Sequence, residues 1–199
     1  MKYAATRTLM AILLITLAAC STTSSTTTVD KQEPDLKEAS KLNVELALGY
    51  IKREQLGVAQ EKLDKAIKED PKNLDAFTTM AYLKTLIGEY QEAVNFYLDA
   101  LDIKPSDPGL HNSYGGLLCE MGKYDDGLKE ISLAYENPFY ETPYLAFANA
   151  GTCYLKQGNL QQAELMLRKA LRVNPDYTGA LLSMAEIGID SKKYLMARA

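Results

Sequence analysis

Residues 144–177 read YLAFANAGTCYLKQGNLQQAELMLRKALRVNPDY, and this stretch carries the pattern that decides the fold. Two segments rich in helix-forming residues flank the turn Gly158-Asn159-Leu160, where glycine can adopt the positive φ that ends a helix. Small residues stand at Ala163 and Ala170, and Pro175 stops the second helix five residues after Ala170. The stretch therefore predicts a pair of helices joined by a short turn.

The same spacing recurs along the chain. Ala66, Ala100, Ala134 and Ala170 are separated by 34, 34 and 36 residues. The same intervals separate Ala59, Ala93, Gly127 and Ala163, and also Leu63, Tyr97, Ile131 and Leu167. This period predicts units at about 40–73, 74–107, 108–143 and 144–177, with a partial fifth at 178–199. The third unit holds two extra residues within ENPFYETP, which spans 136–143.

These features resemble the tetratricopeptide repeat, in which small residues lie where neighbouring helices meet and a proline closes each unit. The predicted fold class is therefore all-α, a right-handed superhelical solenoid of four repeats and a partial fifth, spanning residues 38–199. Its concave groove is the expected binding surface. The first unit departs from the pattern, because Glu54-Gln55-Leu56-Gly57 replaces the glycine turn.

The N-terminus is predicted to be a targeting signal. Residues 1–19 place Lys2 and Arg7 before an apolar run that is too short to cross a bilayer permanently. The sequence LAAC ending at Cys20 resembles a bacterial lipobox, which implies acylation of Cys20 with chains such as palmitate; the alternative is an ordinary cysteine near a conventional cleavage site. Ser21 then implies the periplasmic face of the outer membrane, and residues 20–37 form a Ser/Thr-rich tether.

Composition excludes several classes of function. The net charge is −4, which disfavours nucleic acid as a partner. With one histidine and three cysteines, the sequence shows no catalytic or metal-binding constellation, so we expect no enzymatic activity, no cofactor apart from the lipid on Cys20, no metal and no small-molecule substrate. Partners are expected to be proteins or lipid.

Between His111 and Asn174 the chain resembles a narrower group, the type IV pilus biogenesis lipoproteins of the PilF/PilW family, which are secretin pilotins. The matching residues are Asn112, Tyr114, Gly115, Leu118, Cys119, Asn137, Pro138, Tyr140, Pro143, Asn149, Ala150, Gly151 and Cys153. Residues 43–67 are similar to that family's opening repeat. The family usually has six units, so this sequence departs from it after the fourth.

The resemblance implies a scaffold that helps to localise the type IV pilus secretin at the outer membrane and supports its assembly into multimers, with the secretin subunit as partner. A tetratricopeptide lipoprotein that serves as adaptor for another envelope complex is the alternative.

Cys119 and Cys153 form an even pair for an oxidising compartment and lie on the first helices of adjacent units, where a disulfide is possible. The alternative is two buried thiols. His111 occupies a position that usually holds an aromatic core residue, so we expect it to pack.

Projection of the repeat register predicts which side chains line the groove. The first unit offers the apolar stripe Val44, Leu48 and Ile51, while Leu46 and Tyr50 are expected to take the core positions. Later units offer polar side chains suited to binding a peptide backbone. The predicted groove residues are Val44, Leu48, Ile51, Thr78, Tyr82, Asn112 and Lys156. Asn112 has an alternative role in tying neighbouring helices together.

Overall fold

The computed structural model describes residues 35–190, and this part of the chain is all-α, which confirms the predicted fold class. The helices are α1 (Leu36–Ile51), α2 (Leu56–Glu69), α3 (Leu74–Leu86), α4 (Tyr90–Ile103), α5 (Pro108–Glu120), α6 (Tyr124–Tyr135), α7 (Pro143–Lys156), α8 (Leu160–Val173) and α9 (Thr178–Asp190). The predicted signal peptide, Cys20, most of the tether and the last nine residues of the partial fifth unit lie outside the described residues.

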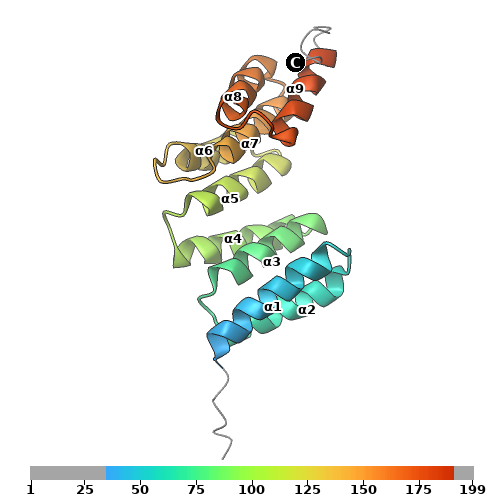
Figure 1. Cartoon of the computed structure of the whole chain (residues 1–199), viewed down its shortest axis with the longest axis vertical. Helices are drawn as coiled ribbons and strands as arrows, with labels where there is room; N and C mark the ends of the chain where they lie inside the picture. Colours follow the sequence, from blue (N-terminus) through green and yellow to red (C-terminus); the bar gives the residue numbers. More distant parts are fainter. Residues whose placement is uncertain (1–34, 191–199) are drawn as a thin grey trace, which may run out of the picture. The chain divides into compact units, whose positions relative to one another are not determined.

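The first eight helices form consecutive pairs, and each pair stacks on the next (Figure 1). Within each pair a short turn returns the second helix along the first. Between pairs, the second helix packs against the first helix of the next unit, and α9 packs against α7 and α8 as a capping helix. This arrangement is a tetratricopeptide array of about four repeats, in which each apolar face is closed by the neighbouring unit.

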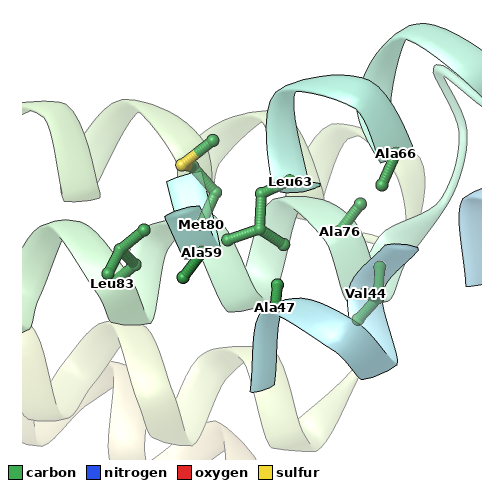
Figure 2. Packing of buried hydrophobic residues seen from close by; sticks show 8 residues of the cluster. All are labelled: Val44, Ala47, Ala59, Leu63, Ala66, Ala76, Met80 and Leu83. Carbon is green, nitrogen blue, oxygen red and sulfur yellow. The ribbon is translucent and has the colours of Figure 1, made fainter. Parts of the chain in front are cut away.

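Alanines at the repeating positions are the points where helices meet. Ala59, Ala66, Ala93, Ala163 and Ala170 are fully buried. Figure 2 shows how such alanines surround a larger side chain in the first cluster, whose members are Val44, Ala47, Ala59, Leu63, Ala66, Ala76, Met80 and Leu83. Because a methyl group is the whole side chain, two backbones can approach closely around each branched residue.

Two glycines bring α5 and α6 still closer together. A Cβ added to Gly115 would lie 2.6 Å from the Gly127 carbonyl oxygen, and one added to Gly127 would lie 2.7 Å from the Gly115 carbonyl oxygen. Real Cβ atoms do not approach backbone atoms so closely. The third unit therefore requires glycine at both positions.

The turn within each unit ends in the same backbone conformation. Gly88, Gly122 and Gly158 have φ values of 81°, 76° and 83°, as the sequence pattern predicts. In the first unit Glu54 takes this place with a φ of 59°. Each turn is closed by an amide that donates to a carbonyl five residues earlier, as Gln55 does to Tyr50 at 3.0 Å. The first turn therefore keeps the geometry of the others without its glycine.

Polar side chains fasten the first unit to the second. The Ser40 hydroxyl donates to the Ala66 carbonyl and accepts from the Asn73 side-chain amide, both at 2.7 Å. Asn73 in turn accepts from the Ala76 amide and so caps α3. Ser40 is fully buried, and these contacts offset the cost of removing its hydroxyl from water.

Lys84 is a buried charge at a core position of the second unit, where the other units have Tyr50, Leu118 and Tyr154. Its ammonium nitrogen lies 2.5 Å from a Glu89 carboxylate oxygen and 2.8 Å from one of Glu92. Hydrogen bonds to these two carboxylates raise the pKa of Lys84. The lysine therefore joins the end of α3 to the beginning of α4 as a cation.

Candidate functional site

A cavity of about 320 Å³ opens between α1 and α3, and we call it the α1–α3 groove. Its lining residues are Lys41, Val44, Glu45 and Leu48 from α1, and Asp75, Thr78 and Thr79 from α3. On α1 these residues follow the spacing i, i+3, i+4, i+7 and on α3 the spacing i, i+3, i+4, so on each helix they share one face. The repeat places the two faces side by side, because the first helices of adjacent units contact each other.

The groove has an apolar centre and a charged edge. Val44 is 5% exposed and belongs to the first core cluster, while Leu48 is 40% exposed and is accessible from solvent. Thr78 donates its hydroxyl hydrogen to the Leu74 carbonyl at 2.7 Å, which leaves its oxygen able to accept a hydrogen bond. Lys41, Glu45 and Asp75 contribute charges of both signs. Such a surface suits an apolar side chain presented by a peptide or a helix.

Three of the predicted groove residues, Val44, Leu48 and Thr78, line this cavity together. Ile51 is half-buried and packs against the first core cluster, so it lies on the core side of α1. Tyr82 is 46% exposed on α3, four residues after Thr78. The apolar stripe of α1 therefore divides between a core side and a groove side.

Asn112 does not line the α1–α3 groove. It is 6% exposed, and its side-chain carbonyl accepts from the Asn149 amide at 3.0 Å while its own amide donates to the Tyr140 hydroxyl at 3.4 Å. These contacts tie α5 to α7 and to the linker before α7. Of the two roles considered from the sequence, the structure places Asn112 in the helix-tying one.

Lys156 also lies outside the groove's lining. Its ammonium nitrogen is 2.5 Å from a carboxylate oxygen of Glu120, so the pair joins α7 to α5. Both side chains are exposed, and a pair of this kind contributes little to stability. The α1–α3 groove thus lies in the first two units, whereas Lys156 lies in the fourth.

Four lining residues were missed at the sequence level: Lys41, Glu45, Asp75 and Thr79. The 34-residue period held a signal for all four, because Asp75 is the equivalent of Lys41 and Thr79 is the equivalent of Glu45, just as Thr78 is the equivalent of Val44. A projection that kept charged and polar residues as well as apolar ones would have found them.

The expectation that Leu46 fills a core position is wrong. Leu46 is 41% exposed and lines a second hollow on α1 with Leu42, Gly49 and Tyr50. In later units the corresponding face is covered by the preceding unit, whereas α1 has no preceding unit among the described residues. Tyr50 is half-buried and does pack against the core.

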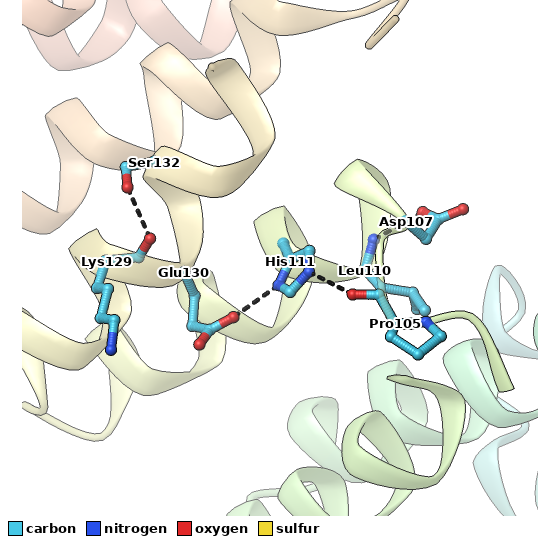
Figure 3. A network of polar contacts seen from close by, with 7 residues as sticks. All are labelled: Pro105, Asp107, Leu110, His111, Lys129, Glu130 and Ser132. Carbon is cyan, nitrogen blue, oxygen red and sulfur yellow. Dashed lines mark hydrogen bonds and ion pairs between the residues drawn. The ribbon is translucent and has the colours of Figure 1, made fainter. Parts of the chain in front are cut away.

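His111 is held between two acceptors rather than placed in a site. Its Nδ1 lies 2.7 Å from a Glu130 carboxylate oxygen, and its Nε2 lies 2.9 Å from the Pro105 carbonyl oxygen (Figure 3). The ring therefore links the α4–α5 linker, α5 and α6, and its role is structural.

Cys119 on α5 and Cys153 on α7 are joined as a disulfide in the structure, with their Cα atoms 5.4 Å apart. The pair lies in the third core cluster beside Ile131, Ala146 and Ala150. The disulfide and the Asn112–Asn149 hydrogen bond both join α5 to α7, the first helices of the third and fourth units.

Over residues 35–190, no group of three or more His, Cys, Asp or Glu side chains is arranged to hold a metal ion. None of the helices in that range has the length and apolar character needed to span a bilayer.

Comparison with known proteins gives matches along most of the chain. Tetratricopeptide repeat models match residues 44–108 and 144–177. The type IV pilus assembly protein PilF of Pseudomonas aeruginosa is 27% identical over 190 residues, which are 96% of this chain and 75% of that protein.

Solved structures agree with these matches. PilW, a widely conserved type IV pilus biogenesis factor, superposes with a TM-score of 0.73 at 28% identity, covering 79% of this chain and 72% of PilW. PilF of P. aeruginosa superposes with a TM-score of 0.72 at 28% identity, covering 82% and 73%.

Proposed function

We propose that this chain, a tetratricopeptide repeat protein related to the PilF and PilW type IV pilus assembly proteins, is a non-enzymatic scaffold for assembly of the pilus secretin. Its similarity to PilF over 96% of its length supports a role in type IV pilus assembly and is the observation that carries the proposal. In this role the α1–α3 groove holds a segment of the secretin subunit, and the lipid on Cys20 keeps the protein at the periplasmic face of the outer membrane.

The groove suits this task because its lining provides an apolar contact surface and hydrogen-bonding groups for a bound segment. Leu48 presents an accessible apolar surface above the buried Val44, and Thr78 offers a hydrogen-bond acceptor beside it. An apolar side chain of a bound helix or extended segment would displace water from Leu48, while Lys41 and Asp75 at the edge would orient its polar neighbours.

Membrane attachment supplies the rest of the proposed mechanism. A protein confined to the membrane surface meets another membrane-bound subunit at a high effective concentration, so weak groove contacts suffice to gather secretin subunits. Two or three acyl chains on Cys20 make such anchoring stable, because each buried methylene contributes about 0.8 kcal/mol.

The test uses a strain that lacks the gene and is complemented with the full chain or with variants. Leu48→Asp places a charge in the apolar centre of the groove and is expected to abolish secretin multimers while monomers persist. Leu98→Asp is the matched control, because Leu98 is similarly exposed at 44% but lies on α4 outside the groove. Circular dichroism checks that both variants fold.

Normal secretin multimers in the deletion strain would overturn the secretin role. Co-purification of another envelope complex in their place would favour the adaptor function. Cys20→Ser, compared in the same strain, separates membrane attachment from groove binding: it is expected to leave binding of the purified subunit intact and to mislocalise the multimers.

A further inference from the structure

The linker between α6 and α7 differs from the other linkers between units. Residues 70–73, 104–107 and 174–177 connect the remaining units, whereas this linker runs from 136 to 142. It extends past the ends of the two helices that it joins (Figure 1). This linker is therefore seven residues long where the others have four, and it forms an additional surface element.

Hydrogen bonds within the linker fix its backbone. The Asn137 side-chain carbonyl accepts from the Phe139 amide at 2.9 Å, and its backbone carbonyl accepts from the Tyr140 amide at 3.1 Å. Pro138, between them, has a fixed φ. The linker around residue 139 is thus ordered before any partner arrives.

Tyr140 fastens the linker to the body of the array. Its ring packs against the third core cluster, and its hydroxyl accepts from the amide of the buried Asn112 at 3.4 Å. Asn112 is itself bound to Asn149 on α7. The residue next to Phe139 therefore connects the linker to both first helices.

Unlike Tyr140, which packs against the core, Phe139 projects into solvent. It is 87% exposed, more than any other large hydrophobic side chain among the described residues. Isolated apolar residues on a surface are common, but this one is presented by a backbone held on both sides. A rigid aromatic ring of this kind loses little conformational entropy on binding, and aromatic anchors of this type often dominate interfaces.

The charges around Phe139 indicate the chemistry of what it meets. Glu136 and Glu141 are exposed on either side, and residues 136–142 contain no Lys or Arg. An anionic lipid surface would be repelled by these carboxylates. A protein pocket bordered by basic side chains would be attracted.

We propose that Phe139 is a docking residue whose ring enters an apolar pocket on a protein partner, and that Lys or Arg side chains bordering this pocket pair with Glu136 and Glu141. The surface comprises residues 136–142. It is separate from the α1–α3 groove and does not depend on the groove's function.

The first experiment places a photo-crosslinking amino acid, benzoylphenylalanine, at Phe139 of the full chain in cells. The matched control places it at Leu182, which is 67% exposed on α9. Irradiation is expected to give a protein adduct at position 139 and none at 182, with the crosslinked peptide lying in an apolar pocket next to Lys or Arg. Absence of an adduct, equal adducts at both positions or adducts with lipid alone would overturn the proposal.

The second experiment measures the affinity of the purified chain for the partner identified by crosslinking. Phe139→Ala is expected to weaken binding at least about tenfold. Glu136→Lys with Glu141→Lys should weaken it similarly and remove its dependence on salt, whereas Leu182→Ala should have no effect. Unchanged affinity of Phe139→Ala would refute docking. Binding to vesicles of phosphatidylethanolamine and phosphatidylglycerol that requires Phe139 would refute a protein partner.

Discussion

Glu54 occupies the turn position that Gly88 occupies 34 residues later, and both have a positive φ, 59° and 81° respectively. The amides that follow them make equivalent hydrogen bonds, from Gln55 to the Tyr50 carbonyl and from Glu89 to the Lys84 carbonyl. The turn is therefore imposed by the repeat rather than by the residue that fills it. A residue with a Cβ is strained in this conformation by roughly 1–2 kcal/mol.

Replacing Glu54 with glycine is expected to raise the free energy of unfolding by about 0.5–1 kcal/mol, since relief of strain exceeds the added entropy of the unfolded chain. Urea denaturation of the full chain measures the change. Glu54→Ala is the control, because it removes the carboxylate but keeps the Cβ, and its stability should match that of the parent. Equal stabilisation by both variants would contradict the backbone explanation.

Gly115→Ala is expected to destabilise the array by at least about 2 kcal/mol, because the new Cβ would meet backbone atoms that cannot move aside. Those atoms are the Gly127 carbonyl oxygen at 2.6 Å and the Ile131 amide nitrogen at 2.9 Å. Gly49→Ala on α1 meets nothing within 4 Å and should stabilise the helix by about 0.5–1 kcal/mol. Thermal unfolding of both variants compares them, and similar melting temperatures would show that the close approach of α5 and α6 is unnecessary.

Loss of the disulfide is expected to lower the free energy of unfolding by about 3–4 kcal/mol, since it closes a loop of 34 residues in the unfolded chain. The measurement is urea denaturation with and without reductant. In the Cys119→Ala, Cys153→Ala variant, reductant should change nothing, because alanine fits the site and no bond remains to reduce. A parent protein insensitive to reductant would argue against the bond.

Asp107 is expected to make the free energy of unfolding depend on pH in the acidic range. Burial by itself would raise the pKa of its carboxyl group, but hydrogen bonds from Lys104 and from the Leu110 and Gly109 amides outweigh burial and lower the pKa below 3.8. Because the unfolded state then binds the proton more readily, the stabilisation is complete only well above pH 3.8, shrinks as the pH falls through that value, and is lost below the lowered pKa.

Asp107→Asn isolates this effect, because its side-chain carbonyl can still cap α5 while its charge is gone. In urea denaturation, parent and variant should differ in stability at pH 7, and the difference should shrink as the pH falls below 3.8. A difference that stays constant between these pH values would exclude the ion pair with Lys104 as the cause.

The repeating positions could be predicted from the sequence because each has a steric requirement that only a few residues meet. Ala59 and Ala163 lie where backbones touch, and Gly122 and Gly158 where φ must be positive. A period of 34 residues reveals such requirements even in a single sequence.

Positions that depend on a neighbour outside the repeat could not be predicted in this way. Leu46 has the register of a core residue, but no unit precedes α1 in the described part of the chain to cover it. Asn112 donates a hydrogen bond to Tyr140, which belongs to the insertion and has no equivalent in other units. Lys84 stands at an apolar position because Glu89 and Glu92 happen to lie within reach.

The disulfide also determines how the protein responds to tension. The whole of α6 and the linker that carries Phe139 lie inside the loop closed by Cys119 and Cys153. A force pulling on the two ends of the chain passes through the sulfur atoms and bypasses these residues. The fully extended length of a single molecule is therefore about 110 Å shorter when the disulfide is intact than when it is reduced. While the disulfide is intact, a force applied to the chain ends therefore does not extend the segment that carries Phe139.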